Sequence, residues 1–436
     1  MKVVIMAGGK GTRISSVASD IPKPMIKIND KPVLEHEIEC LKKQGFKDII
    51  ITVGHLGHII MDYFGDGTKE SPITGEPFGV HIEYFVEDIP LGTAGALFKI
   101  KDKLVGDFLL LNADAIFDID FNKFVNFHKR NKALVTLFTH PNSHPYDSGL
   151  IISKNNIVQQ WLTKEDERPK YYRNEVNAGL HVISSKVLDV VVEGEKIDLD
   201  RQILRPLAKS GKMYVYNSPE YVKDMGTPER YYQVNKDYID GIVQSKNLYN
   251  KQKAIFLDRD GTINKYVGFL KRTDEFELLP NVENAIKKIN ESGYLAIVVT
   301  NQPVIARGDT TFDELEMIHN KLETLLGFEG CYVDAIYFCP HHPDKGFEGE
   351  VAELKFECTC RKPKPGLLFQ AAKDYNIDLS ESWMIGDSEC DVHAGKNANC
   401  KTALITSNSE NFGSDILGKD LNEIIDKIFC MGVGDH

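Results

Sequence analysis

The chain has 436 residues, of which 42% are hydrophobic, so it is long enough for two cores and too long for a single ordinary one. Its 64 acidic residues outnumber 52 basic ones, and the formal charge of -12 excludes a general binder of the nucleic-acid backbone, because like charges repel. No apolar run reaches the roughly 20 residues that span a bilayer. We therefore expect a cytoplasmic, two-domain protein whose partners include neither nucleic acid nor a membrane.

The first half of the chain alternates short apolar strands with helices. Residues 2–7 (KVVIMA) form the first predicted strand, a helix is predicted over residues 33–44 and ends at Gly45, and further strands follow at residues 48–53 and 108–111. This alternation predicts an α/β fold with a doubly wound, mostly parallel sheet of the Rossmann-like type.

A second domain of the same class is predicted after a polar connector. Its strands are expected at residues 253–257, 294–300, 335–338 and 383–385, with helices over residues 281–292 and 312–326. The stretch from Asp237 to Gln252 is polar and poorly periodic, which is typical of a linker. We expect domains at residues 1–238 and 252–436, joined by a linker at residues 239–251.

A glycine-rich loop follows the first strand. Gly8, Gly9 and Gly11 leave backbone amides free to approach phosphate oxygens, Arg13 adds a cationic fork, and Lys23 before Pro24 adds a second cation. A glycine-rich turn alone is more often an ordinary tight turn.

The loop is one of several motifs that together resemble the sugar-1-phosphate nucleotidyltransferase family over roughly residues 1 to 235. The motifs are GGKGTR at 8–13, KPM at 23–25, LGTAG at 91–95, NAD at 112–114, NAG at 177–179 and DMGTP at 224–228. The resemblance implies that a sugar phosphate attacks the α-phosphorus of a nucleoside triphosphate. Arg13 and Lys23 would then stabilise charge on the departing pyrophosphate, and Asp114 and Asp224 would hold Mg²⁺.

The same resemblance assigns the binding residues of this half. It implies that the nucleotide is bound by Gly8, Gly9, Gly11, Thr12, Gly92, Thr93 and Gly95, and the sugar phosphate by Asn177, Gly179 and Arg168. Ala113 replaces a family glycine, and Arg168 replaces a family lysine, which keeps the charge but changes the geometry. The alternative for residues 164–168 is a solvated charged loop.

Residues 258–262 (DRDGT) follow the first strand of the second domain and turn two carboxylates toward one phosphoryl group. With TNQ at 300–302, RKP at 361–363 and GDSECD at 386–391, they resemble the haloacid dehalogenase (HAD) phosphatases, which implies a HAD-like Rossmannoid sheet. The resemblance implies Asp258 as nucleophile, Asp260 as acid and base, Thr300 and Lys362 as phosphate ligands, Asn301 and Arg361 as substrate ligands, and Mg²⁺ at Asp258, Asp260 and Asp387. Asp391 either supports this metal shell or starts a helix.

Seven of the eight cysteines lie between Cys331 and Cys430, which indicates a local metal site better than a disulfide scaffold. Cys339 and His341, followed by Cys358 and Cys360, supply a set of donors that favours tetrahedral, structural Zn²⁺, with His342 outside the set. The alternative is a chance cysteine pair in a core. The cysteine motifs with DRDGT resemble the histidinol-phosphate and heptose-1,7-bisphosphate phosphatase branch, from which Pro303, Val304 and Ser388 depart.

The two resemblances together imply a bifunctional enzyme, because a phosphatase that yields a sugar 1-phosphate would supply the transferase. The expected substrates are D-glycero-D-manno-heptose 1,7-bisphosphate, dephosphorylated at position 7, and GTP, whose GMP would join heptose 1-phosphate to give GDP-heptose and pyrophosphate. The preference for GTP rests on the resemblance, because LGTAG selects no base. The alternatives are a histidinol-phosphate phosphatase fused to a hexose-1-phosphate nucleotidyltransferase, and a non-enzymatic sugar-nucleotide sensor. A homo-oligomer is compatible with the sequence.

Overall fold

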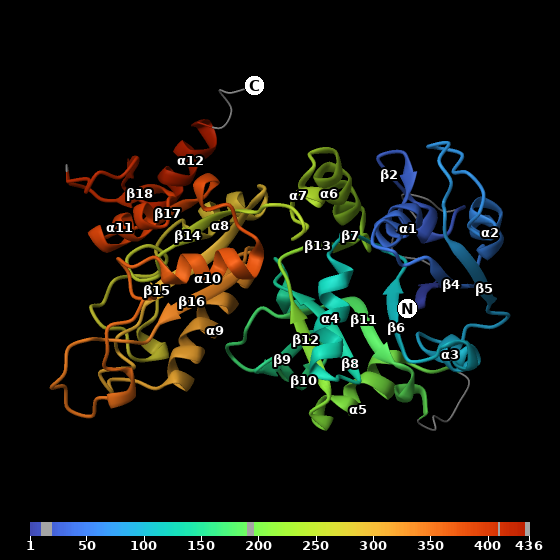
Figure 1. Cartoon of the computed structure of the whole chain (residues 1–436), viewed down its shortest axis with the longest axis horizontal. Helices are drawn as coiled ribbons and strands as arrows, with labels where there is room; N and C mark the ends of the chain where they lie inside the picture. Colours follow the sequence, from blue (N-terminus) through green and yellow to red (C-terminus); the bar gives the residue numbers. More distant parts are fainter. Residues whose placement is uncertain (10–19, 190–195, 409, 432–436) are drawn as a thin grey trace. The chain divides into compact units, whose positions relative to one another are not determined.

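The computed structural model describes residues 1–9, 20–189, 196–408 and 410–431. They form two compact units (Figure 1). The first comprises residues 1–140, 149–163 and 176–247, and the second comprises residues 141–148, 164–175 and 248–436. Within the described ranges, no helix is both long and apolar enough to cross a membrane.

The first unit is built on a nine-stranded sheet in the order β5-β4-β1-β6-β11-β8-β12-β10-β9. Its strands are β1 (Val3–Ala7), β4 (Asp48–Val53), β5 (His81–Val86), β6 (Asp107–Asn112), β8 (Val135–His140), β9 (Leu150–Lys154), β10 (Ile157–Leu162), β11 (Val176–Ser184) and β12 (Met213–Asn217). Strands β5, β4, β1 and β6 are parallel to one another, whereas β11 is antiparallel to both β6 and β8. The predicted α/β class is confirmed, with a mixed sheet in this unit.

Alternate residues of β1 point into two different cores, which is why the sheet is covered on both faces. Val3 and Ile5 pack with α1 (Val33–Lys43), α2 (Gly57–Phe64) and α4 (Phe121–Asn131). Val4 packs with α3 (Gly95–Lys99) and the π-helix Leu199–Leu204 on the other face. α5 (Arg205–Leu207) follows that π-helix.

A small sheet brings two separate parts of the first unit together. β7 (Ala115–Asp118) pairs antiparallel with β13 (Tyr221–Asp224), so that Asp224 lies opposite Ala115. A second small sheet consists of the short strands β2 (Lys27–Ile28) and β3 (Lys31–Pro32), which pair antiparallel. α6 (Pro228–Ile239) starts at the Thr227 cap, and α7 (Ile242–Ser245) occupies part of the segment expected as a linker and buries Val243. The expected domain boundaries stay a prediction.

The second unit contains a six-stranded, wholly parallel sheet in the order β16-β15-β14-β17-β18-β19 (Figure 1). Its strands are β14 (Lys253–Leu257), β15 (Tyr294–Asn301), β16 (Ala335–Cys339), β17 (Trp383–Gly386), β18 (Lys401–Ile405) and β19 (Ile416–Gly418). α8 (Val282–Asn290), α9 (Phe312–Phe328) and α12 (Leu421–Met431) pack on one face, and α10 (Gly366–Tyr375) and α11 (Glu389–Asn397) pack on the other. This arrangement confirms the doubly wound prediction.

Candidate functional site

The glycine loop of the first unit begins where β1 ends. A side chain at Gly8 would lie 2.9 Å from Glu87 Oε1, so the end of the Glu87 side chain lies close to the backbone there. Gly9 is exposed and has open space around it. The predictions for Gly11, Thr12 and Arg13 lie outside the described residues.

Both aspartates predicted to bind metal in the first unit are paired with cations. Lys23 Nζ lies 2.5 Å from Asp114 Oδ2, and Arg230 Nη1 lies 3.1 and 2.9 Å from the two carboxylate oxygens of Asp224. Burial raises the pKa of Asp224, but Arg230, the Gly226 amide and Lys23 outweigh it and hold this pKa below its usual value. The lowered pKa favours the anionic form of Asp224.

The two aspartates also belong to neighbouring backbone segments. The amide of Met225, next to Asp224, donates to the carbonyl oxygen of Asp114 at 3.1 Å. Carboxylate oxygens on adjoining segments suit a hard cation such as Mg²⁺, so the donor chemistry fits the predicted metal. Their side chains are 38% and 44% exposed, which leaves them accessible to a solvated ligand.

The LGTAG loop is fixed by the segment that precedes the π-helix. Gly92 has a φ of 80°, and a side chain on it would lie 2.5 Å from the Ile197 carbonyl oxygen. Thr93 Oγ1 accepts a hydrogen bond from the Leu199 amide at 2.7 Å. Gly95 is buried at the start of α3. In this arrangement Thr93 holds the loop in place, and its contact with a nucleotide stays a prediction.

The predicted sugar-binding turn lies on β11. Gly179 has a φ of 76°, and a side chain there would lie 2.7 Å from Asn112 Nδ2, so only glycine lets β11 approach the NAD motif this closely. The side-chain Oδ1 of Asn177 accepts a hydrogen bond from the Gly179 backbone amide at 3.3 Å. The NAG and NAD motifs, 65 positions apart in the chain, are thus brought together by the pairing of β11 with β6.

Arg168 lies in the second unit and not with the other predicted sugar-phosphate ligands. Its guanidinium donates to the carbonyl oxygens of Pro145, at 2.7 Å, and Ser148. It thereby joins the two segments 141–148 and 164–175, both of which belong to that unit. These two contacts hold the guanidinium on the backbone of residues 145–148, and the substrate-binding role of Arg168 stays a prediction.

The second site lies at the carboxyl ends of the parallel strands β14, β15 and β17. Asp258 follows β14, Thr300 is the second-last residue of β15 and Asp387 follows β17. Because neighbouring parallel strands end at the same sheet edge, residues far apart in sequence converge there. Gly261 completes the arrangement, since its φ is 86° and a side chain on it would lie 1.9 Å from Asp387 Oδ2.

Lys362 is the charged centre of this site. Its Nζ lies 2.7 Å from Asp258 Oδ1 and 2.6 Å from Asp391 Oδ1, and it donates to the Val299 carbonyl oxygen at 2.8 Å. Asp391 is fully buried and also accepts from the Ser388 amide and hydroxyl in a capping box at the start of α11. Asp391 therefore starts α11 and contacts Lys362, and its support of a metal shell stays a prediction.

Burial dominates the electrostatics of the carboxylates in the second site. It raises the pKa of Asp258 to about 7 against the opposing effect of Lys362, and together with the charge of Asp391 it raises the pKa of Asp387 to about 6. Oxygens of Asp258, Asp387 and Asp391 lie within 4.8 Å of one another. Anionic oxygens crowded in this way fit a divalent cation, which would favour their ionised forms.

Asp260 is held by its own set of donors. Its oxygens accept from Asn264 Nδ2 and Gln302 Nε2, each at 2.9 Å, and from the Arg259 guanidinium. The Gln302 amide also donates to Thr300 Oγ1 at 2.9 Å. Thr300, predicted as a phosphate ligand, is thus linked to the predicted acid and base through one glutamine.

The residues flanking Thr300 and Lys362 hold the loop backbone. Asn301 Oδ1 accepts from the Lys362 amide at 3.0 Å, and its Nδ2 donates to the Lys362 carbonyl oxygen at 3.1 Å. The buried Arg361 Nη1 has no hydrogen-bond partner among the described residues. Asn301 therefore positions Lys362, and the substrate contacts predicted for Asn301 and Arg361 stay predictions.

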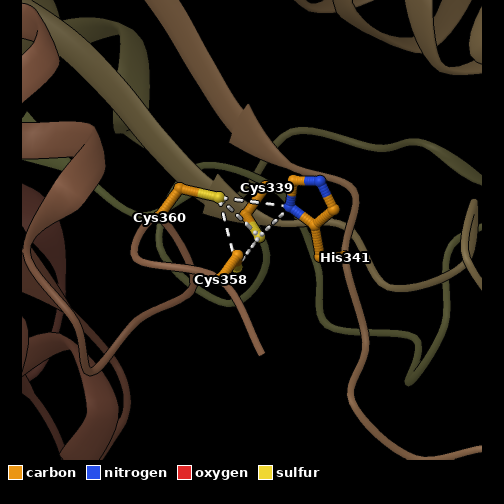
Figure 2. A group of neighbouring side chains, drawn as sticks. All are labelled: Cys339, His341, Cys358 and Cys360. Atoms are coloured by element: carbon orange, nitrogen blue, oxygen red, sulfur yellow. Dashed lines mark hydrogen bonds between the residues drawn. The ribbon is translucent and has the colours of Figure 1, made fainter. Parts of the chain in front are cut away.

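Three thiols and one imidazole converge beside the Lys362 loop (Figure 2). Cys339 Sγ lies 3.5 Å from Cys358 Sγ and 3.2 Å from Cys360 Sγ, and His341 Nδ1 lies 3.3 Å from Cys360 Sγ. All four donor atoms lie within 4.8 Å of one another, as ligands of a single ion must, and their chemistry fits Zn²⁺. His342 lies outside the group, as predicted, and accepts from the Asp344 amide.

Arg230 and Asn264 contribute to the two sites but carried no signal in the sequence. Gln302 and Asp391 lie within motifs of the sequence, but periodicity did not reveal which side chains they contact. A charged residue near a motif is usually solvated, so nothing distinguished Arg230 from its neighbours before the structure was known.

Two family models match separate parts of the chain. Residues 2–241 match the family model described as nucleotidyl transferase, and residues 359–417 match one described as HAD-hydrolase-like. The D-glycero-beta-D-manno-heptose-1,7-bisphosphate 7-phosphatase of Yersinia pestis is 42% identical over 152 residues, which are 35% of this chain and 79% of that protein. The enzyme of Photorhabdus laumondii named for the alpha anomer is 41% identical over 150 residues, which are 34% and 80% of the two chains. The crystal structure of HddC from Yersinia pseudotuberculosis is similar at 26% identity with a TM-score of 0.46, covering 54% of this chain and 99% of that one.

Proposed function

This chain belongs to the nucleotidyl transferase family through residues 2–241 and, through its C-terminal part, to the family of its HAD-like 7-phosphatase relatives, and from this premise we propose one reaction sequence for both parts. The phosphatase removes the 7-phosphate of D-glycero-D-manno-heptose 1,7-bisphosphate. The transferase then joins the resulting heptose 1-phosphate to GMP from GTP, which yields GDP-heptose and pyrophosphate.

The observation that carries this proposal is the fusion of the two activities in one chain. Removal of the 7-phosphate leaves a sugar 1-phosphate. The motifs of the first unit resemble those of enzymes that use a sugar 1-phosphate as the nucleophile. The names of the relatives favour a heptose bisphosphate over histidinol phosphate as the phosphatase substrate. The choice of GTP rests on the motif resemblance alone.

In the phosphatase, Asp258 attacks phosphorus, and the bond from phosphorus to the sugar oxygen breaks. Lys362, 2.7 Å from Asp258, offsets negative charge at the phosphoryl group. Asp260 gives its proton to the leaving oxygen and later takes one from the water that hydrolyses the aspartyl phosphate. Mg²⁺, when held by Asp258, Asp387 and the Asp260 carbonyl, would neutralise the two approaching anions.

In the transferase, an oxygen of the sugar phosphate attacks the α-phosphorus and pyrophosphate leaves without a covalent enzyme intermediate. Lys23 and the amides of the glycine loop stabilise the charge that develops on pyrophosphate. Asp114 and Asp224 would hold Mg²⁺, which would offset the negative charge of the two reactants when bound. Zn²⁺ at the cysteine cluster would have a structural role, because four protein ligands leave no open position for a substrate. Cys360 lies two positions before Lys362, so the ion would hold the loop that presents this lysine. All these substrates are small and soluble, which suits a cytoplasmic enzyme.

The test uses the full chain with heptose 1,7-bisphosphate, Mg²⁺ and each nucleoside triphosphate in separate reactions. Phosphate, pyrophosphate and sugar nucleotide are measured together. We expect GDP-heptose with GTP and phosphate release with every nucleotide. Phosphate release without any sugar nucleotide would contradict the proposed transferase substrate, and an absence of phosphate release would contradict the proposed phosphatase substrate.

A further inference from the structure

The Arg259 guanidinium is fully buried beside the predicted acid and base of the phosphatase. Arg259 has no exposed surface, and its Nη2 donates to Asp260 Oδ1 at 3.0 Å and to Oδ2 at 2.8 Å. Its Nε lies 3.3 Å from Oδ1. A buried guanidinium is costly unless its donors are satisfied, so the fork grips the Asp260 carboxylate in a defined orientation.

The opposite edge of the guanidinium meets His319 of α9. Arg259 Nη1 lies 3.2 Å from His319 Nε2. Burial, and then the charge of Arg259, lower the pKa of His319 to about 3, so the imidazole is neutral and Nε2 accepts the hydrogen bond. The neighbours of His319 on α9, Ile318 and Leu322, are fixed in the core. The ring is therefore held in place by α9, and its Nε2 fixes the position of the Arg259 guanidinium.

We propose that Arg259 and His319 are positioning residues, which orient the Asp260 carboxyl for proton transfer to the leaving alkoxide. This inference rests on the proposed phosphatase role of Asp260. Burial raises the pKa of Asp260, but Arg259, Asn264 and Gln302 outweigh it and hold this pKa below its usual value, so the carboxyl is a strong acid once it is protonated. The proton leaves the carboxyl as the bond between phosphorus and the leaving oxygen breaks, so a misdirected carboxyl slows this step. Asn264 and Gln302 supply the remaining donors to the two oxygens, which leaves the histidine to act only through Arg259.

The role predicts a dependence on the leaving group that mere loss of packing would not produce. An alkoxide needs a proton to depart, whereas p-nitrophenolate leaves as a stabilised anion and gains little from an acid. The ratio kcat/KM reports only steps up to departure of the leaving group, so it excludes the later use of Asp260 as a base. Heptose 1,7-bisphosphate and p-nitrophenyl phosphate therefore separate positioning from general damage.

The experiment compares His319→Phe with His319→Gln in the full chain, with zinc content and circular dichroism checked for each. We expect His319→Phe to lower kcat/KM about tenfold or more for the heptose bisphosphate and less than about twofold for the aryl ester. Glutamine restores an acceptor near the Nε2 position, so we expect it to recover most of the loss. Arg259→Lys, which keeps the charge and loses the fork, should show the same selectivity and serves if the phenylalanine variant does not fold.

Equal losses with both esters, or no loss with either, would overturn the positioning role and leave the phosphatase assignment intact. Failure of the unmodified chain to hydrolyse either ester would overturn the phosphatase assignment as well. A glutamine variant as impaired as the phenylalanine variant would also contradict the proposal, because it would show that the acceptor atom is not what matters.

Discussion

Thr324 and Tyr172, 152 positions apart in the chain, bind each other through two hydrogen bonds. The Tyr172 amide donates to Thr324 Oγ1 at 2.8 Å, and the same hydroxyl donates to the Tyr172 carbonyl oxygen at 3.0 Å. Both residues are in the second unit, where α9 thereby holds the segment 164–175, which contains Arg168. Tyr146 stacks on Phe328 of the same helix, with ring centroids 6.4 Å apart.

We expect Thr324→Val to loosen this segment, because valine keeps the shape and removes both hydrogen bonds. If the two hydrogen bonds contribute about 1.4 kcal/mol of stabilising free energy, their loss would raise the equilibrium constant for opening of the segment roughly tenfold. Hydrogen exchange at the Tyr172 amide measures this change, and Thr324→Ser, which keeps the hydroxyl, is the matched control. Unchanged exchange in the valine variant would show that other contacts hold the segment.

Glu323, also on α9, makes the stability of the same unit depend on pH. Its Oε2 accepts from the Asn174 amide at 2.6 Å, and burial, opposed by Arg173, raises its pKa from 4.5 to about 7. The folded state therefore binds more protons than the unfolded state, and stability is lost as pH rises from about 4.5 through 7. Glutamine does not titrate, so the Glu323→Gln variant lacks this pH-dependent contribution. As the pH is raised from 5 to 8, we expect the unfolding temperature of the variant to decrease less than that of the unmodified chain. Parallel temperature curves for the two proteins would refute the raised pKa.

Asp258→Asn should abolish the phosphatase and spare the transferase. The amide is a poor nucleophile, so we expect phosphate release to fall about 10³-fold or more. Supplied heptose 1-phosphate and GTP should still give GDP-heptose at close to the unmodified rate. Phosphate release at an unchanged rate would reject Asp258 as the nucleophile.

Asp114→Asn provides the reciprocal variant. It removes one anionic oxygen donor and the partner of Lys23, so we expect pyrophosphate release to fall about 100-fold. Phosphate release from the bisphosphate is the internal control and should stay within about twofold. Normal nucleotidyl transfer by this variant would show that Asp114 is not needed to hold the metal ion.

Cys360→Ser should lower bound zinc and phosphatase activity together. The serine hydroxyl is a weaker ligand than a thiolate, and the loop that presents Lys362 starts at this position. Elemental analysis and phosphate release are measured on the same samples, with the exposed Cys430 changed to serine as the control. Retention of zinc with full activity would argue against the cluster as a metal site.

Motif order in the sequence was enough to predict two α/β units, the sheet edge at which Asp258 lies and the four donors of the cysteine cluster. These features depend on local patterns: strands alternate with helices, polar residues follow strand ends, and ligand pairs are close in the chain. The linker prediction was less informative, since α7 buries Val243 within the segment 239–251.

The tertiary structure alone decided which charges pair. It placed Arg230 on Asp224, Lys362 between Asp258 and Asp391, His319 behind Arg259, and Arg168 on the backbone of residues 145–148. Each of these side chains is long or lies far in sequence from its partner, so neither periodicity nor motif spacing determines its direction. The sequence by itself determined the kinds of chemistry in this protein, because motif residues are local. The structure decided which groups orient the reacting ones, because orientation depends on contacts between distant segments.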